Sequence, residues 1–115
     1  MQTAKQPPAG TMALSYTTAL ILQALASGHG YGFEIMDVTG LASGTVYPAL
    51  RRLESTGHVV SRWEDEARAT AEGRPARRYY ELSAEGEALL AESRRRFPKL
   101  ARGFSGGFDP NPEPA

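Results

Sequence analysis

The sequence predicts a mainly helical α+β domain with the layout of a winged helix-turn-helix, and three observations lead to this fold class. Three amphipathic segments follow one another over residues 15–57, two strand-like runs come next, and a fourth helical segment follows them. The order is therefore helix, helix, helix, strand, long loop, strand, helix. A helix-turn-helix followed by a hairpin is the arrangement of that class, and it indicates the fold more strongly than it indicates DNA binding.

The first helix is expected from Ser15 to Ala26, where side chains recur at helical spacing and Gly28 supplies a stop. A second, short helix follows Tyr31 and ends before Gly40. The positions that define the two helices are Leu14, Thr18, Ile21, Leu22 and Leu25 in the first and Phe33, Ile35, Met36 and Val38 in the second.

The third helix begins near Ser43 or Thr45, which are both good N-cap residues. Pro48 is harmless only in the first turn of a helix, where backbone N–H groups have no partner, and this favours Thr45 as the cap. Gly57 ends the helix. Its buried stripe, at positions i, i+4 and i+7, is Val46, Leu50 and Leu53.

Two runs rich in β-branched and aromatic residues, 59–64 and 77–82, predict the strands of a hairpin that we call the wing. The segment between them, residues 65–76, is polar, holds Gly73 and Pro75, and is too long for a tight turn. We therefore expect a long loop there.

A fourth helix opens after Ser83, with acidic residues in its first turn and three arginines, 94–96, near its end, as the helix dipole favours. Pro98 breaks or kinks this helix. Both ends of the chain are rich in proline and glycine and bury too little apolar area to offset the entropy of ordering. The expected organisation is a flexible tail over 1–12, a winged domain over 13–83, a C-terminal helix over 84–102 and a second tail over 103–115.

Composition is that of an ordinary globular domain, since 41% of the residues are hydrophobic and 23% are charged. The chain has no cysteine, which excludes a disulfide framework and a thiolate metal site. Neither a membrane span nor a signal peptide is present in the sequence, so we expect a cytoplasmic protein. The 13 basic and 13 acidic side chains balance, so an argument for DNA depends on where the arginines fall.

Catalysis finds little support. His29 and His58 are the only histidines, and each is better explained as a structural or exposed residue because no nucleophile motif accompanies it. The carboxylates at 64–66 are consecutive and do not converge as a general acid and base. The alternating glycines at 28–32 follow a helix rather than a strand, unlike a phosphate-binding loop. We expect no enzyme, no metal and no cofactor.

The exposed start of the third helix is the first candidate DNA contact. In helix-turn-helix proteins the N-terminal residues of the second helix of the motif enter the major groove. Ser43, Thr45 and Tyr47 carry hydroxyls that can donate to phosphates or bases, and a helix N-terminus favours an anion. The alternative is that Ser43 and Thr45 only cap the helix and that Tyr47 only covers the core.

Arg51 and Arg52 lie farther along the same helix and can contact phosphate. The alternative for this pair is a solvated helix face, with local ion pairs to Glu54 or Glu34. Base readout by either arginine is the weaker expectation.

Basic residues also gather on the outgoing side of the hairpin loop, where a wing commonly lies over the DNA backbone or minor groove. Arg74 and Arg77 are the better candidates, whereas Arg78 alternates to the opposite face and serves the core or a salt bridge. The loop also carries carboxylates at 64–66 and at Glu72, which DNA would repel.

Three segments resemble the signature of the PadR family of transcriptional regulators: Tyr31–Ile35, Ser43–Glu54 and Gly73–Gly86. The last is similar to that family's wing and its exit into the last helix, and the resemblance covers roughly residues 14–97. It implies a cytoplasmic regulator, usually a repressor, that binds a palindromic operator in double-stranded DNA as a homodimer.

Carried over to this chain, the family's roles fall on the start of the third helix and on the wing. The contacts implied by the resemblance are Ser43, Thr45, Tyr47, Arg51 and Arg74, with Tyr31 as a backbone contact. The full set of expected DNA contacts also includes Val46, Arg52 and Arg77. Short family members pair through their first and last helices. The implied dimer contacts are Leu22, Leu25, Leu89, Leu90 and Phe97.

The chain also departs from the family's pattern. Phe33 stands where tyrosine is common, which removes a phosphate-contacting hydroxyl. The connection over residues 39–42 is very short, and the segment after residue 96 leaves one C-terminal helix per subunit for a dimer.

Some family members bind aromatic effectors between subunits, and Trp63, Phe97 and Phe104 are the residues here that could line such a site. We favour the alternative, in which Trp63 packs under the wing and Phe97 lies in the dimer seam. A rival from another class is a winged-helix module that binds protein without DNA. Zero net charge and the acidic start of the hairpin loop support that rival.

Overall fold

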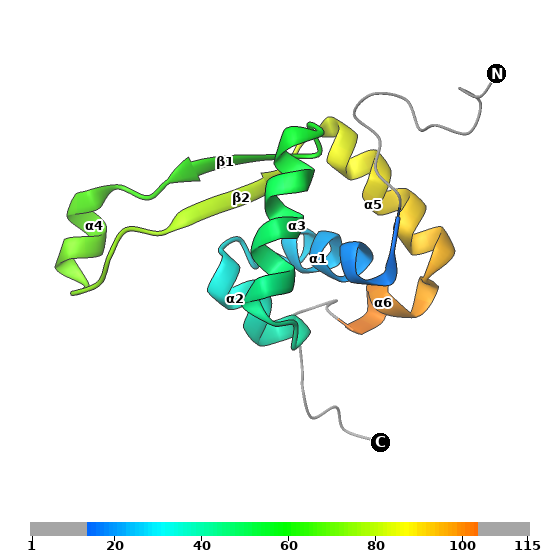
Figure 1. Ribbon diagram of the computed structural model, residues 1–115, viewed down its shortest axis with the longest axis horizontal. Helices are drawn as coiled ribbons and strands as arrows, with labels where there is room; N and C mark the ends of the chain where they lie inside the picture. The colour runs from blue at the N-terminus through cyan, green and yellow to red at the C-terminus, as the bar shows by residue number, and fades with distance from the viewer. Residues whose placement is uncertain (1–13, 104–115) are drawn as a thin grey trace.

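The computed structural model describes residues 14–103, and the order of its elements follows the predicted order with two additional short helices (Figure 1). The predicted tails, apart from residue 103, lie outside the described residues. The helices are α1 (Tyr16–Ala26), α2 (Gly32–Thr39), α3 (Ser43–Ser55), α4 (Glu66–Ala71), α5 (Ala84–Arg96) and α6 (Pro98–Gly103), and the strands are β1 (Val59–Trp63) and β2 (Arg78–Leu82).

Serine side chains cap two of the long helices, and the sequence predicts that the later of these opens after Ser83. The hydroxyl of Ser15 accepts from the amide of Thr18 at 3.0 Å, and that of Ser83 accepts from the amide of Gly86 at 3.1 Å. Each satisfies one of the amides left without a partner at a helix start. Gly40 ends α2 with a left-handed φ of 77°, a conformation that glycine adopts at little cost.

The predicted cap of the third helix is wrong, because the N-cap lies three residues before Thr45. The amides of Thr45 and Val46 both donate to the carbonyl oxygen of Ala42, at 2.9 and 3.0 Å, which places Thr45 inside the first turn. Ala42 is the N-cap and offers no side-chain hydrogen bond. Pro48 consequently sits inside the helix, where its missing N–H leaves the carbonyl of Gly44 without the usual partner.

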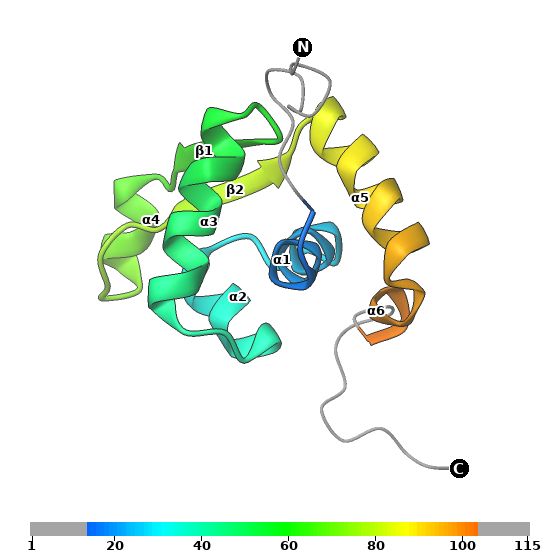
Figure 2. The same ribbon diagram turned by 45° about the vertical axis from the view of Figure 1, so that its right-hand side comes forward.

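Helix α1 lies at the centre of the helical body, between α3 and α5 (Figure 2). Because several elements surround it, its apolar side chains are shielded over much of the helix surface. The buried core comprises Ile21, Leu22, Ala24, Leu25, Ile35, Val46, Ala49, Leu50, Leu53, Val59 and Leu90.

Three of the predicted dimer contacts are therefore core residues of the single chain. The exposed fractions of Leu22, Leu25 and Leu90 are 0%, 8% and 4%. Helices α1 and α5 pack against each other within one chain, and this contact uses the apolar faces that the prediction assigned to a second subunit. Leu89 and Phe97 are only half-buried and stay available to a partner.

The C-terminal segment is two helices rather than one. Helix α5 ends at Arg96, Phe97 leaves the helical conformation, and α6 begins at Pro98, which lacks the N–H needed to continue α5. At its other end α5 lies close to the backbone of the preceding turn. A Cβ atom on Gly86 would overlap the carbonyl oxygen of His58, so glycine permits this approach.

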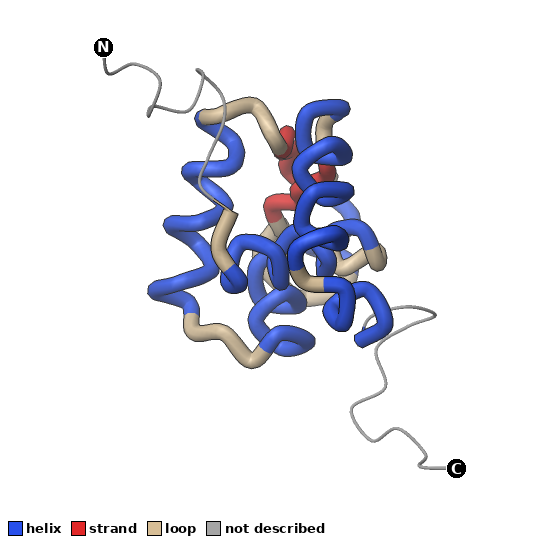
Figure 3. Tube along the Cα trace, turned by 90° about the vertical axis from the view of Figure 1, so that its right-hand side faces the viewer, coloured by secondary structure: helices blue, strands red, loops and turns tan. Residues whose placement is uncertain are grey.

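The antiparallel hairpin of β1 and β2 projects from the helical body (Figure 1) and is seen foreshortened in the perpendicular view (Figure 3). Its register pairs Val59 with Leu82 and Trp63 with Arg78. The predicted long loop is wrong in one respect, because residues 66–71 form α4 at the far end of the hairpin. Asp65 caps this helix by accepting from the amide of Ala67 at 3.2 Å.

Candidate nucleic-acid interface

The N-terminal face of α3 presents hydroxyl groups at the surface. Ser43, Thr45 and Tyr47 are all exposed, which is required of residues that meet base edges or phosphates. Val46 was also predicted as a DNA contact. Its side chain cannot make that contact in this fold, because it is completely buried among the core residues. Adjacent helix positions are about 100° apart around the axis, so Val46 faces the core while Tyr47 lies at the surface.

Tyr47 is held by the start of α2. A Cβ atom placed on Gly32 would lie 2.5 Å from Cζ and from Oη of Tyr47, so the ring occupies the space that any larger residue would need. The ring is nevertheless 39% exposed. Tyr47 therefore neither belongs to the core, as the alternative proposed, nor moves freely.

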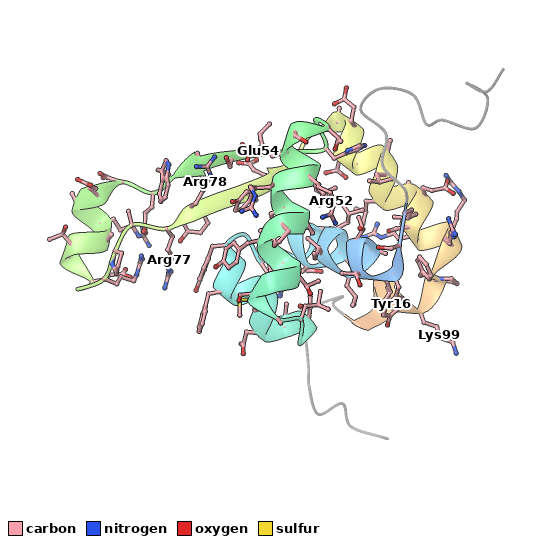
Figure 4. The ribbon with its side chains drawn as sticks, viewed as in Figure 1. Tyr16, Arg52, Glu54, Arg77, Arg78 and Lys99 are labelled. Atoms are coloured by element: carbon pink, nitrogen blue, oxygen red, sulfur yellow. The ribbon has the colours of Figure 1, made fainter. Side chains whose placement is uncertain are left out.

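Arg51 and Arg52 are exposed, and among residues 14–103 no ion pair involves either guanidinium. Of the carboxylates considered as their partners, Glu54 pairs with Arg78 at 3.5 Å, and Glu34 lies 3.3 Å from a ring nitrogen of His29. Figure 4 shows Arg52 on the side of α3 that faces away from the wing. The two arginines are therefore available to an anion, on different sides of the helix.

Arg74, predicted as a phosphate contact, is instead committed to the protein. Its guanidinium makes five hydrogen bonds: two to Glu64, at 2.7 and 2.9 Å, two to Glu72, at 2.9 and 3.1 Å, and one to the carbonyl of Pro75, at 3.3 Å. A guanidinium has five N–H donors. All five are used within the wing, so the fold does not support the expected phosphate contact of Arg74, which stays a prediction.

Glu64 is the acceptor at the centre of this arrangement. Its side chain is 4% exposed and also accepts from the backbone amide of Arg77 at 3.1 Å. The hydrogen bonds from Arg74 hold the pKa of Glu64 at about 2, against a usual 4.5, and the same contact raises the pKa of Arg74. The carboxylate that DNA was expected to repel is thus neutralised within the wing.

Arg77 lies between the wing and α2. Its Cζ atom is 4.1 Å from the centroid of the Tyr31 ring, and Tyr31 meets Tyr79 edge-on with centroids 5.5 Å apart. The pKa of Arg77 is raised, first by a hydrogen bond with Tyr79. An arginine stacked on a ring keeps N–H edges for an anion, so Arg77 stays a candidate phosphate contact.

Arg78 forms the predicted salt bridge. It lies 3.5 Å from Glu54 of α3, donates to the hydroxyl of Ser61 at 3.1 Å, and has its Cζ atom 5.4 Å from the centre of the Trp63 ring. Figure 4 shows Arg77 and Arg78 on the wing, with Glu54 near the C-terminal half of α3. This pairing fixes the wing against the helix that precedes it.

A groove of about 630 Å³ runs between the wing and the starts of α2 and α3. Its walls are aromatic and basic: Tyr31, Phe33, Tyr47, Trp63, Arg77, Arg78 and Tyr80. Phe33, expected as an apolar position of the second helix, and Trp63, expected to pack under the wing, are instead 70% and 62% exposed. The alternation of side chains along a strand could have predicted from the sequence that Trp63 and Ser61 share one face. The groove could not be predicted in this way, because it forms only when the hairpin folds over α3.

The residues expected at an aromatic effector site do not meet within one chain. Trp63 lines the groove beside the wing, whereas Phe97 lines a separate cleft of about 380 Å³ with Tyr16, Pro98, Lys99 and Leu100. Phe104 lies outside the described residues. A site shared between two subunits stays a prediction.

The apolar surface over α1 and α6 is the candidate dimer contact. Tyr16 is 54% exposed, and its ring meets Phe97 edge-on with centroids 5.5 Å apart. Half-buried Leu100 lines the same cleft, so apolar area stays uncovered on the side that carries Tyr16 and Lys99 in Figure 4. Surfaces of this kind mark association sites.

Other kinds of site were sought in the part of the chain that the structure describes. It contains no cluster of three or more metal-ligating side chains of His, Cys, Asp or Glu. None of the helices in that part is long and apolar enough to cross a membrane. Buried His58 contacts the hydroxyl of Thr56 at 2.7 Å, which agrees with a structural role.

Comparison with known proteins gives consistent matches. The model of the transcriptional regulator PadR-like family matches residues 21–92. The transcriptional regulator Rv3488 of Mycobacterium tuberculosis is 40% identical over 81 residues, which are 70% of this chain and 63% of that protein. The chain thus spans less than two thirds of that relative's length.

Two solved structures share the fold. A PadR family transcription regulator from hypervirulent Clostridium difficile R20291 has a TM-score of 0.61 at 30% identity, covering 80% of this chain and 100% of that one. A transcriptional regulator from Clostridium thermocellum has a TM-score of 0.57 at 24% identity, covering 81% and 99%. The family resemblance and the winged fold expected from the sequence are confirmed.

Proposed function

The chain belongs to the PadR-like family of transcriptional regulators, and on this basis we propose that it binds double-stranded DNA as a homodimer and represses transcription from an inverted-repeat operator. The members of this family are transcriptional regulators rather than enzymes. The proposal includes a cytoplasmic location, where its DNA would be.

The observation that carries the proposal is the surface formed by the start of α3. Ser43, Thr45 and Tyr47 are exposed there, and Arg51 follows one to two turns later with no carboxylate partner among the described residues. The amide groups of the first turn of α3 add a positive partial charge at the same place. Hydroxyls, a guanidinium and a helix N-terminus together suit phosphates and base edges.

The second part of the contact is the wing stem rather than its tip. Arg77 is stacked on Tyr31 beside the groove and lies near α3, whereas the tip around α4 carries several carboxylates and a fully engaged Arg74. DNA repels the tip, so only the stem would approach the backbone.

A homodimer would use the uncovered surface around Tyr16, Leu89 and Phe97. A twofold axis through this surface would place two copies of α3 in successive major grooves about 34 Å apart, which requires an inverted repeat. This keeps Leu89 and Phe97 from the implied contacts, leaves out the three leucines that are buried within one chain, and adds Tyr16.

Fluorescence anisotropy with labelled duplex from the gene's own upstream region tests the proposal, across a salt series and with scrambled competitor. We expect preferential binding that weakens steeply as salt rises, because each phosphate contact releases counterions. Sedimentation of the free protein should show a dimer. A folded protein that binds no duplex at low salt would contradict the proposal and favour a protein-binding winged helix.

A further inference from the structure

The groove between the wing and α3 exposes large aromatic side chains, two of which have no part in the proposed contact of α3 with DNA. Phe33 and Trp63 are 70% and 62% exposed, and Tyr47 is 39% exposed. All three line this groove together with Arg77 and Arg78. Large apolar side chains gathered at one exposed place mark an interaction site, so the groove needs a partner that is apolar in part and anionic in part.

Rings and guanidiniums adjoin one another along this groove. The Cζ atom of Arg77 is 4.1 Å from the centre of the Tyr31 ring, and that of Arg78 is 5.4 Å from the centre of the Trp63 ring. Stacking orders each guanidinium while leaving N–H groups at its edge for an acceptor. Arg78 also faces Glu54 at 3.5 Å, so Arg77 is the guanidinium with more free donor capacity.

We propose that this groove holds one sugar–phosphate strand of double-stranded DNA, with Trp63 and Phe33 packed against deoxyribose rings and Arg77 on a phosphate. A DNA strand presents apolar sugar rings and anionic phosphates in turn, which matches the adjacent rings and cations of the groove. The inference rests on the proposed DNA binding and adds two residues that the sequence analysis did not assign to DNA.

Continuity with the α3 surface supports this occupant. Tyr47 belongs both to the exposed start of α3 and to the wall of the groove, so a strand that leaves the major groove contact of α3 passes directly over the groove. Phe33 and Trp63 are more than half exposed and do not enclose a volume, as a small-molecule pocket usually does. An extended polymer fits such open walls better than a compact ligand.

Trp63 is the only tryptophan of the chain, so its fluorescence reports the groove without a label. The first experiment titrates the full chain with a random-sequence duplex at low salt and measures quenching of Trp63 by acrylamide, a neutral quencher that DNA does not repel. Labelled duplex reports binding by anisotropy in parallel. We expect the quenching constant to fall by about half or more when duplex is bound, because a sugar ring would cover the indole.

The second experiment compares variants on the two faces of β1. Trp63→Ala should weaken duplex binding about tenfold with an unchanged dependence on salt, because an apolar contact releases no counterions. Trp63→Phe should restore most of the affinity. Val60→Ala is the matched control, since Val60 is 53% exposed three residues away and faces the other side of the hairpin.

Arg77→Gln should behave differently from Trp63→Ala, with a salt slope lower by about one because one phosphate contact is lost. Thermal melts of all four variants check that each one folds. A duplex that binds while acrylamide quenching of Trp63 is unchanged, or a Trp63→Ala variant that binds like the wild type, overturns the groove assignment and leaves DNA binding by α3 intact.

Failure of the underlying proposal gives a different result. If no duplex binds the folded protein at low salt, both the regulator and the groove assignment fail. If sodium naphthoate protects Trp63 from acrylamide and bound duplex does not, the groove takes a small aromatic acid, and the assignment to DNA is overturned.

Discussion

Two N–H groups of the Arg74 guanidinium donate to the two carboxylate oxygens of Glu64, at 2.7 and 2.9 Å. Glu64 directly follows β1, and Arg74 lies between α4 and β2. The contact therefore joins the two ends of the segment that contains α4. Bidentate pairs of this geometry are the strongest charged hydrogen bonds in proteins. Glu64 and Arg74 therefore close the wing tip.

Replacing Arg74 with alanine should open the wing tip without removing a phosphate contact. The amide of Glu64 donates to the carbonyl of Arg77, and the amide of Arg77 donates to the carboxylate of Glu64. In the variant, both amides should exchange with solvent about tenfold faster or more. The salt slope of DNA binding should stay that of the wild type. A slope lowered by about one would show that Arg74 contacts phosphate after all.

Acid should open the same tip at a low pH. The pKa of Glu64 is about 2 when folded and 4.5 otherwise, and hydrogen bonds from Arg74 are the main cause. A depressed pKa contributes stability that is complete above pH 4.5 and is lost as the pH falls toward 2. NMR titration of the Arg77 amide should follow this window, and the Glu64→Gln variant should lack the transition. A midpoint near 4.5 would contradict the ion pair.

Gly32→Ala should damage DNA binding more than stability. The added Cβ would meet the outer atoms of the Tyr47 ring, and a side-chain end can turn away at a cost below about 1 kcal/mol. Tyr47→Ala should lower operator affinity in the same manner and leave the melting temperature nearly unchanged, because its ring is 39% exposed. Thermal melts and anisotropy on both variants test this. A large loss of stability in Tyr47→Ala would return Tyr47 to the core.

Phe97→Arg should convert the proposed dimer to a monomer. The ring lies edge-on to exposed Tyr16 and lines the cleft that includes Lys99, so a new cation there would face its own copy and nearby positive charge. Sedimentation velocity measures the change. Val60→Arg, on the exposed face of the wing, is the control and should leave the association state unchanged. Equal behaviour of the two variants would place the dimer contact elsewhere.

Local signals in the sequence were sufficient to predict the four longest helices and both strands. Helix α5 opens after Ser83 and α2 ends before Gly40, as predicted, whereas Ser15, expected inside the first helix, is its cap. Capping depends on residues within three positions of each other, so it can be read directly from the chain. The short helix α4 was missed although Asp65 is a good cap, because six residues give no helical periodicity.

The errors share a different origin. Helical spacing identified Leu22, Leu25 and Leu90 as apolar, but spacing does not tell whether the same chain or a second one covers them. Likewise the charge of Arg74 is visible in the sequence, whereas its neutralisation depends on a carboxylate ten residues away. Contacts that form only in the folded chain decide which predicted residues remain at the surface.

Arg51 gives the most direct test that the exposed face of α3 binds DNA. Anisotropy across a salt series compares Arg51→Gln with Arg95→Gln, an exposed arginine on α5 that serves as the matched control. The account predicts a salt slope lower by about one and a weaker affinity for Arg51→Gln, with Arg95→Gln unchanged. Equal slopes and affinities for the wild type and Arg51→Gln would contradict it.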